Sequence, residues 1–321
     1  MRTWRLAALV LLPLVLGGCG GNSDSTSPAN EPDGSFAVGE TRFVFVDPTR
    51  PTAANGSAPG KDSRTLRTTV YYPAKGPPDG QARIGAPPVS GRRFPLIIFA
   101  HGFTAVAKIY YTTLQAWAAA GYVVAAPDFP LSSGGTPGGP VAGDYINQPA
   151  DESFLIDQML AQTGDAASLL HNLIDPELIG ASGQSLGAMT TFGLSMNTCC
   201  RDPRIDAAVP MAGNLPPYPG GEYRSELAPP TLIIHGDVDD AVPYADALEA
   251  YDLLLPPKFL LTHEGGAHIL PYVGTNPAVA ATIESSTAFF DHYLKRERGA
   301  RQRLLEIDGR DHVALVYDLG S

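Results

Sequence analysis

Residues 174–196 read IDPELIGASGQSLGAMTTFGLSM, and this stretch decides the fold. Leu178 to Ala181 form a short apolar run, which is typical of a strand buried on both faces of a sheet. Leu186 to Met196 have the pattern of a helix. Gly183-Gln184-Ser185-Leu186-Gly187 joins the two, and glycine suits both flanking positions because a sharp strand-to-helix turn leaves no room there for a Cβ atom. Such a turn raises Ser185 clear of the sheet, so the stretch predicts a serine nucleophile.

Short apolar runs of the same kind recur on both sides of this stretch. They predict strands at residues 64–72, 96–100, 122–126, 207–212, 231–235 and 258–262. Helices are predicted around residues 114–120, from Asp151 onward, in a further helix up to Leu173, and over residues 278–297. Buried strands that alternate with helices indicate an α/β protein with a mostly parallel sheet covered on both faces.

The segments between these elements also carry predictions. Residues 73–91 and 129–150 are rich in glycine and proline and are predicted as loops, the second of which can wall a substrate site. In the tail, residues 299–321, the run HVALVY alternates as a strand does, and we assign the tail no function. Ligands of parallel sheets bind beyond the carboxyl ends of the strands, and every chemical candidate below follows a predicted strand.

A serine hydroxyl is a weak nucleophile at neutral pH and needs a base that a third group orients. The strand at 231–235 is followed by three aspartates, Asp237, Asp239 and Asp240, and each of them is a candidate for that third group. No glycine and terminal glutamate stand at the spacing of a calcium-binding loop in this segment. The residues alone therefore place the acid in this loop and leave the choice open.

The base is sought among seven histidines, at positions 101, 171, 235, 263, 268, 292 and 312. His268 lies in Gly265-Gly266-Ala267-His268, where glycines let a loop approach Ser185, so it is the preferred base. His263, at the end of a predicted strand, is the alternative. The others are expected to support loops (101 and 235), to lie in helices (171 and 292) or to lie in the tail (312).

The first eighteen residues predict an export signal. Arg2 and Arg5 precede an apolar run, Leu6 to Leu16, that is too short to span a membrane. Leu16-Gly17-Gly18-Cys19 resembles the bacterial lipobox, in which the cysteine carries lipid and becomes the mature N-terminus. The chain is thus divided into a signal peptide at 1–18, a polar flexible tether at 19–35 and one folded domain at 36–321. We expect an exported bacterial lipoprotein on the cell membrane or outer membrane, held by this anchor only and facing away from the cytoplasm.

Charge and cysteine usage exclude several partner classes. The formal net charge of −11 disfavours nucleic acid as a partner, because an acidic surface repels phosphate backbones. Cys199 and Cys200 are adjacent, and no second cysteine or histidine pair stands at metal-ligand spacing, so we predict no metal. Export favours oxidation of this pair. Neighbouring Cα atoms, about 3.8 Å apart, are closer than ordinary bridges prefer, so a disulfide and two free thiols both remain open.

These motifs together resemble one branch of the α/β-hydrolase superfamily. The stretches LIIFAHGF, GYVVAAPDFP, DQML, IDPELIGASGQSLGA, LIIHGDVDDAVP and GGAH carry the resemblance, which covers roughly residues 65–298. The branch includes platelet-activating-factor acetylhydrolases, chlorophyllases, dienelactone hydrolases and bacterial cutinases. Many relatives have His or Trp where this chain has Gln184, and a second glycine where it has Ala188. The first change alters the floor of the substrate site and argues against a polyester substrate.

The resemblance also implies roles for individual residues. The pattern H-G-x-x-D-x-x-V-P selects Asp239 as the acid beside Ser185 and His268. It implies an oxyanion hole formed by the backbone N–H groups of Phe103 and Leu186, with the Phe103 ring beside the acyl pocket. The implied activity is hydrolysis of a small-molecule or lipid-like carboxylic ester through an acyl-enzyme, without a cofactor. Alternatives are a cutinase-like or lipid-hydrolysing enzyme, an envelope acyltransferase, a peptidase, and a binding lipoprotein without catalytic activity.

Overall fold

The computed structural model describes residues 35–310 and 312–320. The predicted signal peptide, the lipidation site Cys19 and nearly all of the tether lie outside the described residues. Among the residues described, no helix has the length and apolar character needed to cross a membrane.

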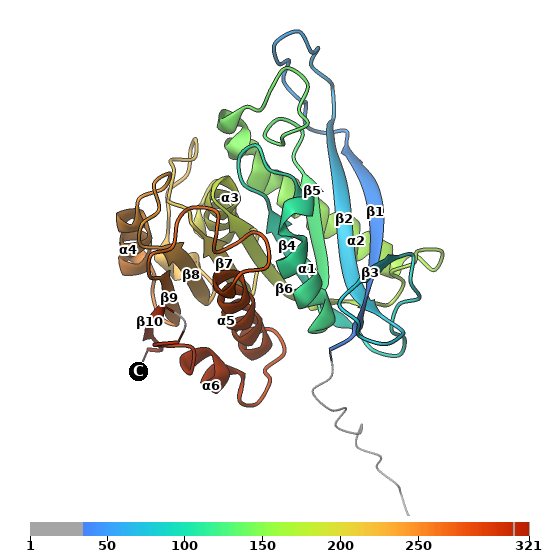
Figure 1. Cartoon of the computed structure of the whole chain (residues 1–321). Helices are drawn as coiled ribbons and strands as arrows, with labels where there is room; N and C mark the ends of the chain where they lie inside the picture. Colours follow the sequence, from blue (N-terminus) through green and yellow to red (C-terminus); the bar gives the residue numbers. More distant parts are fainter. Residues whose placement is uncertain (1–34, 311, 321) are drawn as a thin grey trace, which may run out of the picture. The chain divides into compact units, whose positions relative to one another are not determined.

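A ten-stranded sheet forms the centre of the described part of the chain, with strand order β10-β9-β8-β7-β6-β4-β5-β2-β1-β3 (Figure 1). The strands are β1 (Ala37–Asp47), β2 (Arg64–Ala74), β3 (Ala82–Ile84), β4 (Phe94–Ala100), β5 (Val123–Asp128), β6 (Ile174–Gln184), β7 (Ala207–Met211), β8 (Thr231–Gly236), β9 (Lys258–His263) and β10 (Val313–Asp318). The run from β9 through β8, β7, β6 and β4 to β5 is parallel throughout. The predicted α/β fold with a mostly parallel sheet is therefore confirmed.

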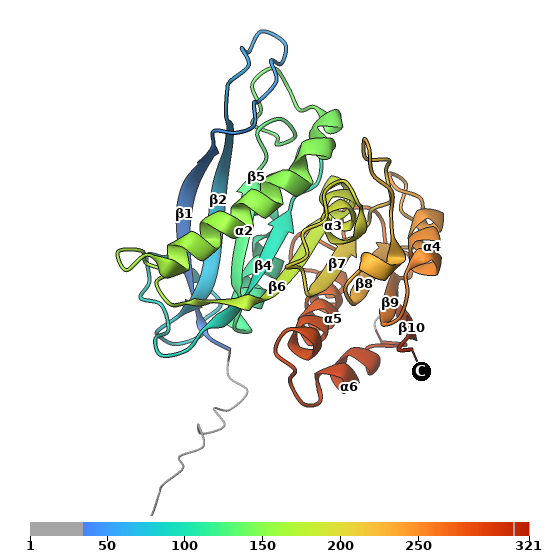
Figure 2. The ribbon, with the colours of Figure 1, turned by 180° about the vertical axis from the view of Figure 1, so that it is seen from behind.

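Helices cover both faces of this sheet. On one face, α1 (Tyr111–Ala119) and α5 (Pro277–Tyr293) pack together, and the Trp117 ring meets the Phe290 ring at 5.6 Å between centroids. The other face carries α2 (Gln148–Gly164), α3 (Leu186–Met196) and α4 (Tyr244–Leu253), as the reverse view shows (Figure 2). The strands between them are buried on both sides, which explains their continuous apolar sequences.

The remaining elements lie at the margins of the sheet. The short helix α6 (Ala300–Leu305) follows α5, and the predicted tail strand is present as β10. β10 pairs antiparallel with β9 and covers its outer edge, so the tail completes the sheet. At the other margin, β1 pairs antiparallel with β2 along eleven residues.

Four sequence expectations were wrong or incomplete. The segment 129–150 is not loop throughout, because residues 142–147 form the 3₁₀ helix η2 (Ala142–Asn147) and α2 begins at Gln148. No second helix leads to Leu173; residues 165–173 form turns, and His171 lies there. β3 lies inside the predicted loop 73–91, and β1 was not predicted. These two strands lack a continuous apolar run, because they lie at the sheet margin and are partly exposed.

A buried ion cluster fixes the segment above the sheet. Arg64, at the start of β2, donates to both carboxylate oxygens of Asp144 in η2 at 2.8 and 3.1 Å, and to both of Asp151 in α2 at 2.6 and 2.7 Å. All three side chains are at most 2% exposed. Burial disfavours the charge of Arg64, but the two carboxylates outweigh this and raise its pKa. The cluster therefore holds η2 and the start of α2 against the sheet.

Candidate active site

The register of the parallel strands brings the predicted site residues to one edge. Ala100 of β4 pairs with Gly183 of β6, and Gln184 pairs with Met211 of β7. Farther along the sheet, β8 and β9 end together at the pair formed by Gly236 and His263. The loops that leave these strand ends carry Phe103, Ser185, Asp239 and His268, and so these residues collect at the carboxyl edge.

Ser185 lies in a strained backbone conformation. Its φ of 58° and ψ of −118° are unusual for a residue with a side chain, and its N–H donates to Met211 O at 2.8 Å. A Cβ atom at Gly183 would lie 2.3 Å from Gly187 O, and one at Gly187 would lie 2.0 Å from Ala100 O. Both glycines of the motif are therefore required by close backbone approach, as the sequence predicted.

Ala188 stands where many relatives have glycine, and Gly213 makes room for its methyl group. Ala188 is fully buried in the first turn of α3. A Cβ atom built on Gly213, in the loop after β7, would lie only 2.4 Å from the Cβ of Ala188. The missing side chain at Gly213 thus leaves the space that the methyl group of Ala188 occupies.

Ser185, His268 and Asp239 form a continuous chain of hydrogen bonds. His268 Nδ1 lies 2.7 Å from Asp239 Oδ2, and His268 Nε2 lies 2.8 Å from Ser185 Oγ. A carboxylate can only accept, so Nδ1 carries the proton and Nε2 is free to accept from the serine hydroxyl. The Asp239 side chain is fully buried, while that of His268 is 13% exposed. This is the arrangement required of a base oriented by an acid.

Backbone groups hold the Asp239 carboxylate in place. Its Oδ1 accepts from the N–H groups of Ala241 at 2.9 Å and Val242 at 2.8 Å, which leaves Oδ2 for His268. His235 Nε2 lies 3.0 Å from Val242 O and 3.2 Å from Asp239 Oδ2. Burial lowers the pKa of His235, so it is neutral and supports this loop, as the sequence predicted.

The alternative residues lie outside this chain of hydrogen bonds. Asp237 accepts from Gly265 N–H at 2.6 Å and thereby braces the loop that carries His268. His263 bonds Thr282 Oγ1 at 2.8 Å, and burial lowers its pKa to about 4. Asp240 is exposed and makes no hydrogen bond to the other site residues described here. Among the described candidates, only His268 bonds Ser185, and only Asp239 forms a hydrogen bond to His268 from the acid loop.

His101 fixes the loop that holds the predicted oxyanion donor. Its Nδ1 donates to Gly102 O at 2.8 Å, and its Nε2 accepts from Phe129 N–H at 3.0 Å. Burial lowers its pKa, which favours the neutral ring that this donor and acceptor pattern needs. The Phe103 N–H donates to no acceptor among the described residues, and Leu186, as the first residue of α3, has no acceptor within the helix. Both N–H groups are therefore available to a ligand.

Gln184 differs from its predicted role as a substrate contact. Its side chain is 1% exposed, and both ends of its amide are engaged. Oε1 accepts from Tyr110 Oη at 2.8 Å, and Nε2 donates to His268 O at 3.0 Å. Tyr110 Oη in turn accepts from Gly102 N–H at 3.1 Å. A buried relay thus connects the Phe103 loop to the backbone of His268.

Tyr110 is the site residue that sequence reasoning missed. It lies in η1 (Ala107–Tyr110), and its ring meets Phe99 at 4.8 Å, as an ordinary core residue would. Burial raises its pKa to about 12, so the hydroxyl keeps its proton and can donate to Gln184. The sequence around it contains no motif, because its partner lies 74 positions away.

Exposed apolar side chains lie in the loops that carry the site residues. Phe103 is 41% exposed, and Val238, next to Asp239, is 57% exposed. Ile269 and Leu270 directly follow His268 and are 47% and 65% exposed. These side chains belong to the same loops that carry the site residues, so the site opens onto a rim of apolar groups.

Away from this edge, the structure pairs Cys199 and Cys200 in a disulfide. Among the residues described, no group of three or more His, Cys, Asp or Glu side chains is arranged to hold a metal ion.

The chain was compared with known protein families and solved structures. The family described as Chlorophyllase matches residues 61–235, more than half of the chain, including Ser185. The chain belongs to the chlorophyllase family. No curated protein matches the sequence. A solved structure, the ferulic acid esterase from Streptomyces cinnamoneus, is similar with a TM-score of 0.67 at 22% identity, covering 88% of this chain and 96% of that chain.

These findings confirm two of the sequence predictions. The resemblance to the branch that contains chlorophyllases is borne out by the family match, and the α/β-hydrolase fold by the structural likeness. The family match supports an ester-hydrolysing α/β hydrolase, and the solved structure supports the fold. Asp239 and His268 lie beyond the matched range, so their assignment rests on the geometry above.

Proposed function

We propose that the protein is a serine esterase that cleaves carboxylic esters through an acyl-enzyme, with Ser185 as nucleophile, His268 as base and Asp239 as acid. The observation that carries this proposal is the chain of hydrogen bonds from Asp239 through His268 to Ser185 Oγ, at 2.7 and 2.8 Å. The strained φ of Ser185 adds support, because strain of this kind concentrates at functional residues.

In the first half of the reaction, Ser185 Oγ attacks the ester carbonyl carbon and its proton passes to His268 Nε2. Asp239 stabilises the imidazolium that forms. The carbonyl oxygen becomes an oxyanion, which the N–H groups of Phe103 and Leu186 stabilise. The carbon–oxygen bond to the leaving group then breaks, and His268 returns the proton to the departing alcohol, leaving the acyl group on Ser185.

In the second half, a water molecule replaces the alcohol. His268 removes a proton from it, the hydroxide attacks the acyl carbon, and the proton returns to Ser185 Oγ as the acid leaves. Each step uses only groups of this chain, substrate and water.

The apolar rim favours esters with apolar acyl or alcohol parts. Phe103, Val238, Ile269 and Leu270 would cover such a group and remove its surface from water, at about 25 cal/mol per Å². The name of the similar solved structure, a ferulic acid esterase, agrees with an ester substrate. We propose short- to medium-chain acyl esters first and lipid-like esters second.

We further propose that the enzyme acts outside the cytoplasm as a lipid-anchored protein. This rests on the apolar run before Cys19 and on the lipobox-like sequence that ends there.

The test is an assay of the purified chain on p-nitrophenyl esters from acetate to palmitate, with Ser185→Ala alongside. We expect the variant to lose activity by about 10⁴- to 10⁶-fold, since the triad acts as a unit. Ser182→Ala is the matched control: this serine is three residues earlier and donates to Val209 O at 2.7 Å in the sheet. It should cost about 1 kcal/mol of stability and leave the rate intact.

The outcomes separate the alternatives. A Ser185→Ala variant with the wild-type rate would sink the proposal. If the folded wild-type protein hydrolyses none of these esters, the binding lipoprotein without catalytic activity would be favoured. Formation of a new ester when a second alcohol is added would favour acyl transfer.

A further inference from the structure

A strongly basic segment follows α5 at the edge of the sheet opposite the candidate site. Residues 295–303 read KRERGARQR and hold five of the chain's 22 lysines and arginines, with one acidic residue. The rest of the chain is acidic, since the whole carries a net charge of −11. Positive charge is therefore concentrated locally in a protein that otherwise repels anions.

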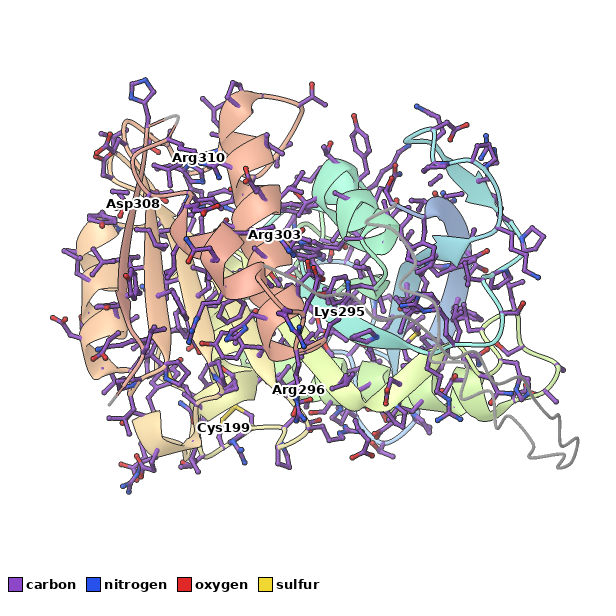
Figure 3. The ribbon with its side chains drawn as sticks, turned by 90° about the horizontal axis from the view of Figure 1, so that it is seen from below. Cys199, Lys295, Arg296, Arg303, Asp308 and Arg310 are labelled. Atoms are coloured by element: carbon purple, nitrogen blue, oxygen red, sulfur yellow. A yellow bond between two sulfur atoms is a disulfide. The ribbon has the colours of Figure 1, made fainter. Side chains whose placement is uncertain are left out.

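Three of these arginines project from the surface. Arg296, Arg298 and Arg301 are exposed, form no ion pair with a described residue, and line a hollow of about 460 Å³ between the end of α5 and α6. The hollow is also lined by His292, Glu297, Gly299 and Gln302. Lys295, Arg296 and Arg303 are visible on this face in Figure 3.

The acidic groups nearby are largely neutralised. Arg303 binds Asp291 and Glu297, each at 2.9 Å, and Lys295 also binds Asp291. Asp206, which accepts from Ile179 N–H at 3.0 Å, also interacts electrostatically with Arg296. The arginines that line the hollow therefore give this face a positive potential.

The described start of the chain lies at the same place. Phe36 N–H donates to Ala119 O at 2.7 Å, and Lys295 Nζ donates to the adjacent Ala120 O. A Cβ atom on Gly121 would lie 3.1 Å from the Phe36 ring and 3.6 Å from Lys295 Nζ. Both views of the ribbon place the start of β1 and α6 at the same end of the molecule (Figures 1 and 2).

The candidate site lies at the other end of α5. This helix begins after Asn276, whose side chain donates to Leu270 O at 2.9 Å in the loop that follows His268. Its 17 residues span about 25 Å, so the basic face and the site are separated by that length. A surface bound to the basic face would leave the site open to solvent.

We propose that residues 295–303 bind the surface of an anionic phospholipid bilayer and hold the enzyme with its active edge directed away from the membrane. The proposal rests on the predicted lipid anchor at Cys19, not on the esterase activity. Sixteen positions separate Cys19 from Ser35, a segment that the sequence predicts to be a flexible tether, and linkers of that kind and length reach about 20–24 Å. The anchor alone thus leaves orientation free, and a basic face beside the tether fixes it.

Because salt screens charges, the electrostatic potential at this face depends mainly on the charges nearby. The Debye length is about 8 Å at physiological salt, so the acidic groups at the far edge contribute little to the potential felt by a membrane here. Each arginine near an anionic surface strengthens binding by about fivefold, and three therefore by on the order of 100-fold.

The experiment measures which face approaches the bilayer. The full chain is labelled with a dye at Gln302→Cys, beside the hollow, or at Ser57→Cys, in the exposed loop between β1 and β2 at the other edge. Each is mixed with vesicles of phosphatidylcholine alone, or of phosphatidylcholine with phosphatidylglycerol, that carry a headgroup quencher. The test variant is Arg296→Gln/Arg298→Gln/Arg301→Gln. The control, Lys61→Gln/Arg67→Gln/Lys108→Gln, removes the same charge from exposed residues elsewhere.

We expect strong quenching at residue 302 and weak quenching at residue 57 on anionic vesicles, reduced by added salt. On neutral vesicles, or with the test variant, quenching at residue 302 should fall, while the control variant behaves as the wild type. Equal quenching on both lipids, an unaffected test variant, or equal loss in both variants would overturn the proposal. Hydrolysis of p-nitrophenyl acetate, measured in parallel, reports on the esterase proposal separately.

Discussion

Two buried polar networks lie along the same edge of the sheet, and they are built differently. In the first, Arg64 is enclosed by Asp144 and Asp151, and each carboxylate binds it with both oxygens. In the second, the hydrogen bonds run from Asp239 through His268 to Ser185, which is partly exposed and has a positive φ. In the first network every carboxylate oxygen binds Arg64, and Asp151 also pairs with Arg50 at 2.8 Å, so we call this network closed. The second network ends at an oxygen that a ligand can reach.

This difference separates structure from function. A closed network contributes to the free energy of unfolding, because removing one member leaves a buried charge with fewer partners. An open network keeps one reactive group available, and the strain at Ser185 is held by the backbone around it. Substitutions in the first should therefore alter stability with activity unchanged, and substitutions in the second should do the reverse.

Among substitutions that keep Ser185 and His268, the largest effect is expected for Asp239→Asn. The amide oxygen can keep the bonds to Ala241 and Val242, so its NH₂ group would face His268 Nδ1 and place the ring proton on Nε2. Nε2 could then not accept from Ser185, and kcat/KM on p-nitrophenyl acetate should fall about 10⁴-fold with an unchanged melting temperature. Asp237→Asn is the control, and equal losses in the two variants would contradict the assignment.

The closed network is tested by Arg64→Leu. Removing the guanidinium leaves Asp144 buried without an ion pair and leaves Asp151 with only Arg50, which is partly exposed and lies 2.8 Å away, so the free energy of unfolding should fall by about 3–5 kcal/mol. Urea denaturation measures the loss, while kcat per folded molecule should stay at the wild-type value. Arg42→Leu, which removes an exposed partner of Glu40, should change stability little. A large drop in kcat for Arg64→Leu would show that the two networks are coupled.

One group beside the closed network is unsatisfied, and its replacement should stabilise the protein. Glu152 is fully buried next to Asp151, and neither carboxyl oxygen has a hydrogen-bond partner among the described residues. Burial, and then the charge of Asp151, raises its pKa well above the usual value. The folded state thus holds the proton more tightly than the unfolded state, and stability is lost as the pH rises from the unfolded pKa, about 4.3, through the folded one.

Glu152→Met removes this titration at similar side-chain length. We expect the variant to be about 1–3 kcal/mol more stable than wild type at pH 8, with the advantage shrinking toward pH 4. Chemical denaturation across this pH range gives the difference. Glu249→Met, at an exposed position of α4, should show no such pH dependence. A Glu152→Met variant that is less stable at every pH would mean that the carboxyl has a structural partner.

The sequence predicted the features that depend on neighbouring residues. The apolar runs located the parallel strands, and Gly183 to Gly187 located the serine, because both signals depend on a few adjacent residues. Strand register then implied that the site residues would meet. The margin strand β1 and the turns at 165–173 were missed, since exposed strands have weaker patterns and turns can resemble short helices.

Contacts between distant residues could not be predicted in the same way. Gln184 was placed at the substrate floor, but its partners Tyr110 and His268 lie 74 and 84 positions away. Arg64 and Asp151 are separated by 87 positions. Such pairs depend on how whole elements pack, and neither residue type nor spacing specifies them.

The smallest effect is expected for Tyr110→Phe, which tests whether the relay belongs to the open network. The ring still packs on Phe99, but Gly102 N–H loses its acceptor and Gln184 Oε1 its donor. Because the relay touches the Phe103 loop and the His268 backbone, kcat should fall by up to about tenfold with KM unchanged, and stability by about 1 kcal/mol. Tyr122→Phe is the matched control, since its buried hydroxyl donates to Asp291 at 2.7 Å beside the basic face. Tyr122→Phe should lose similar stability and keep the wild-type kcat. An equal fall of kcat in both variants would mean that the hydrogen bonds of Tyr110 have no specific role in catalysis.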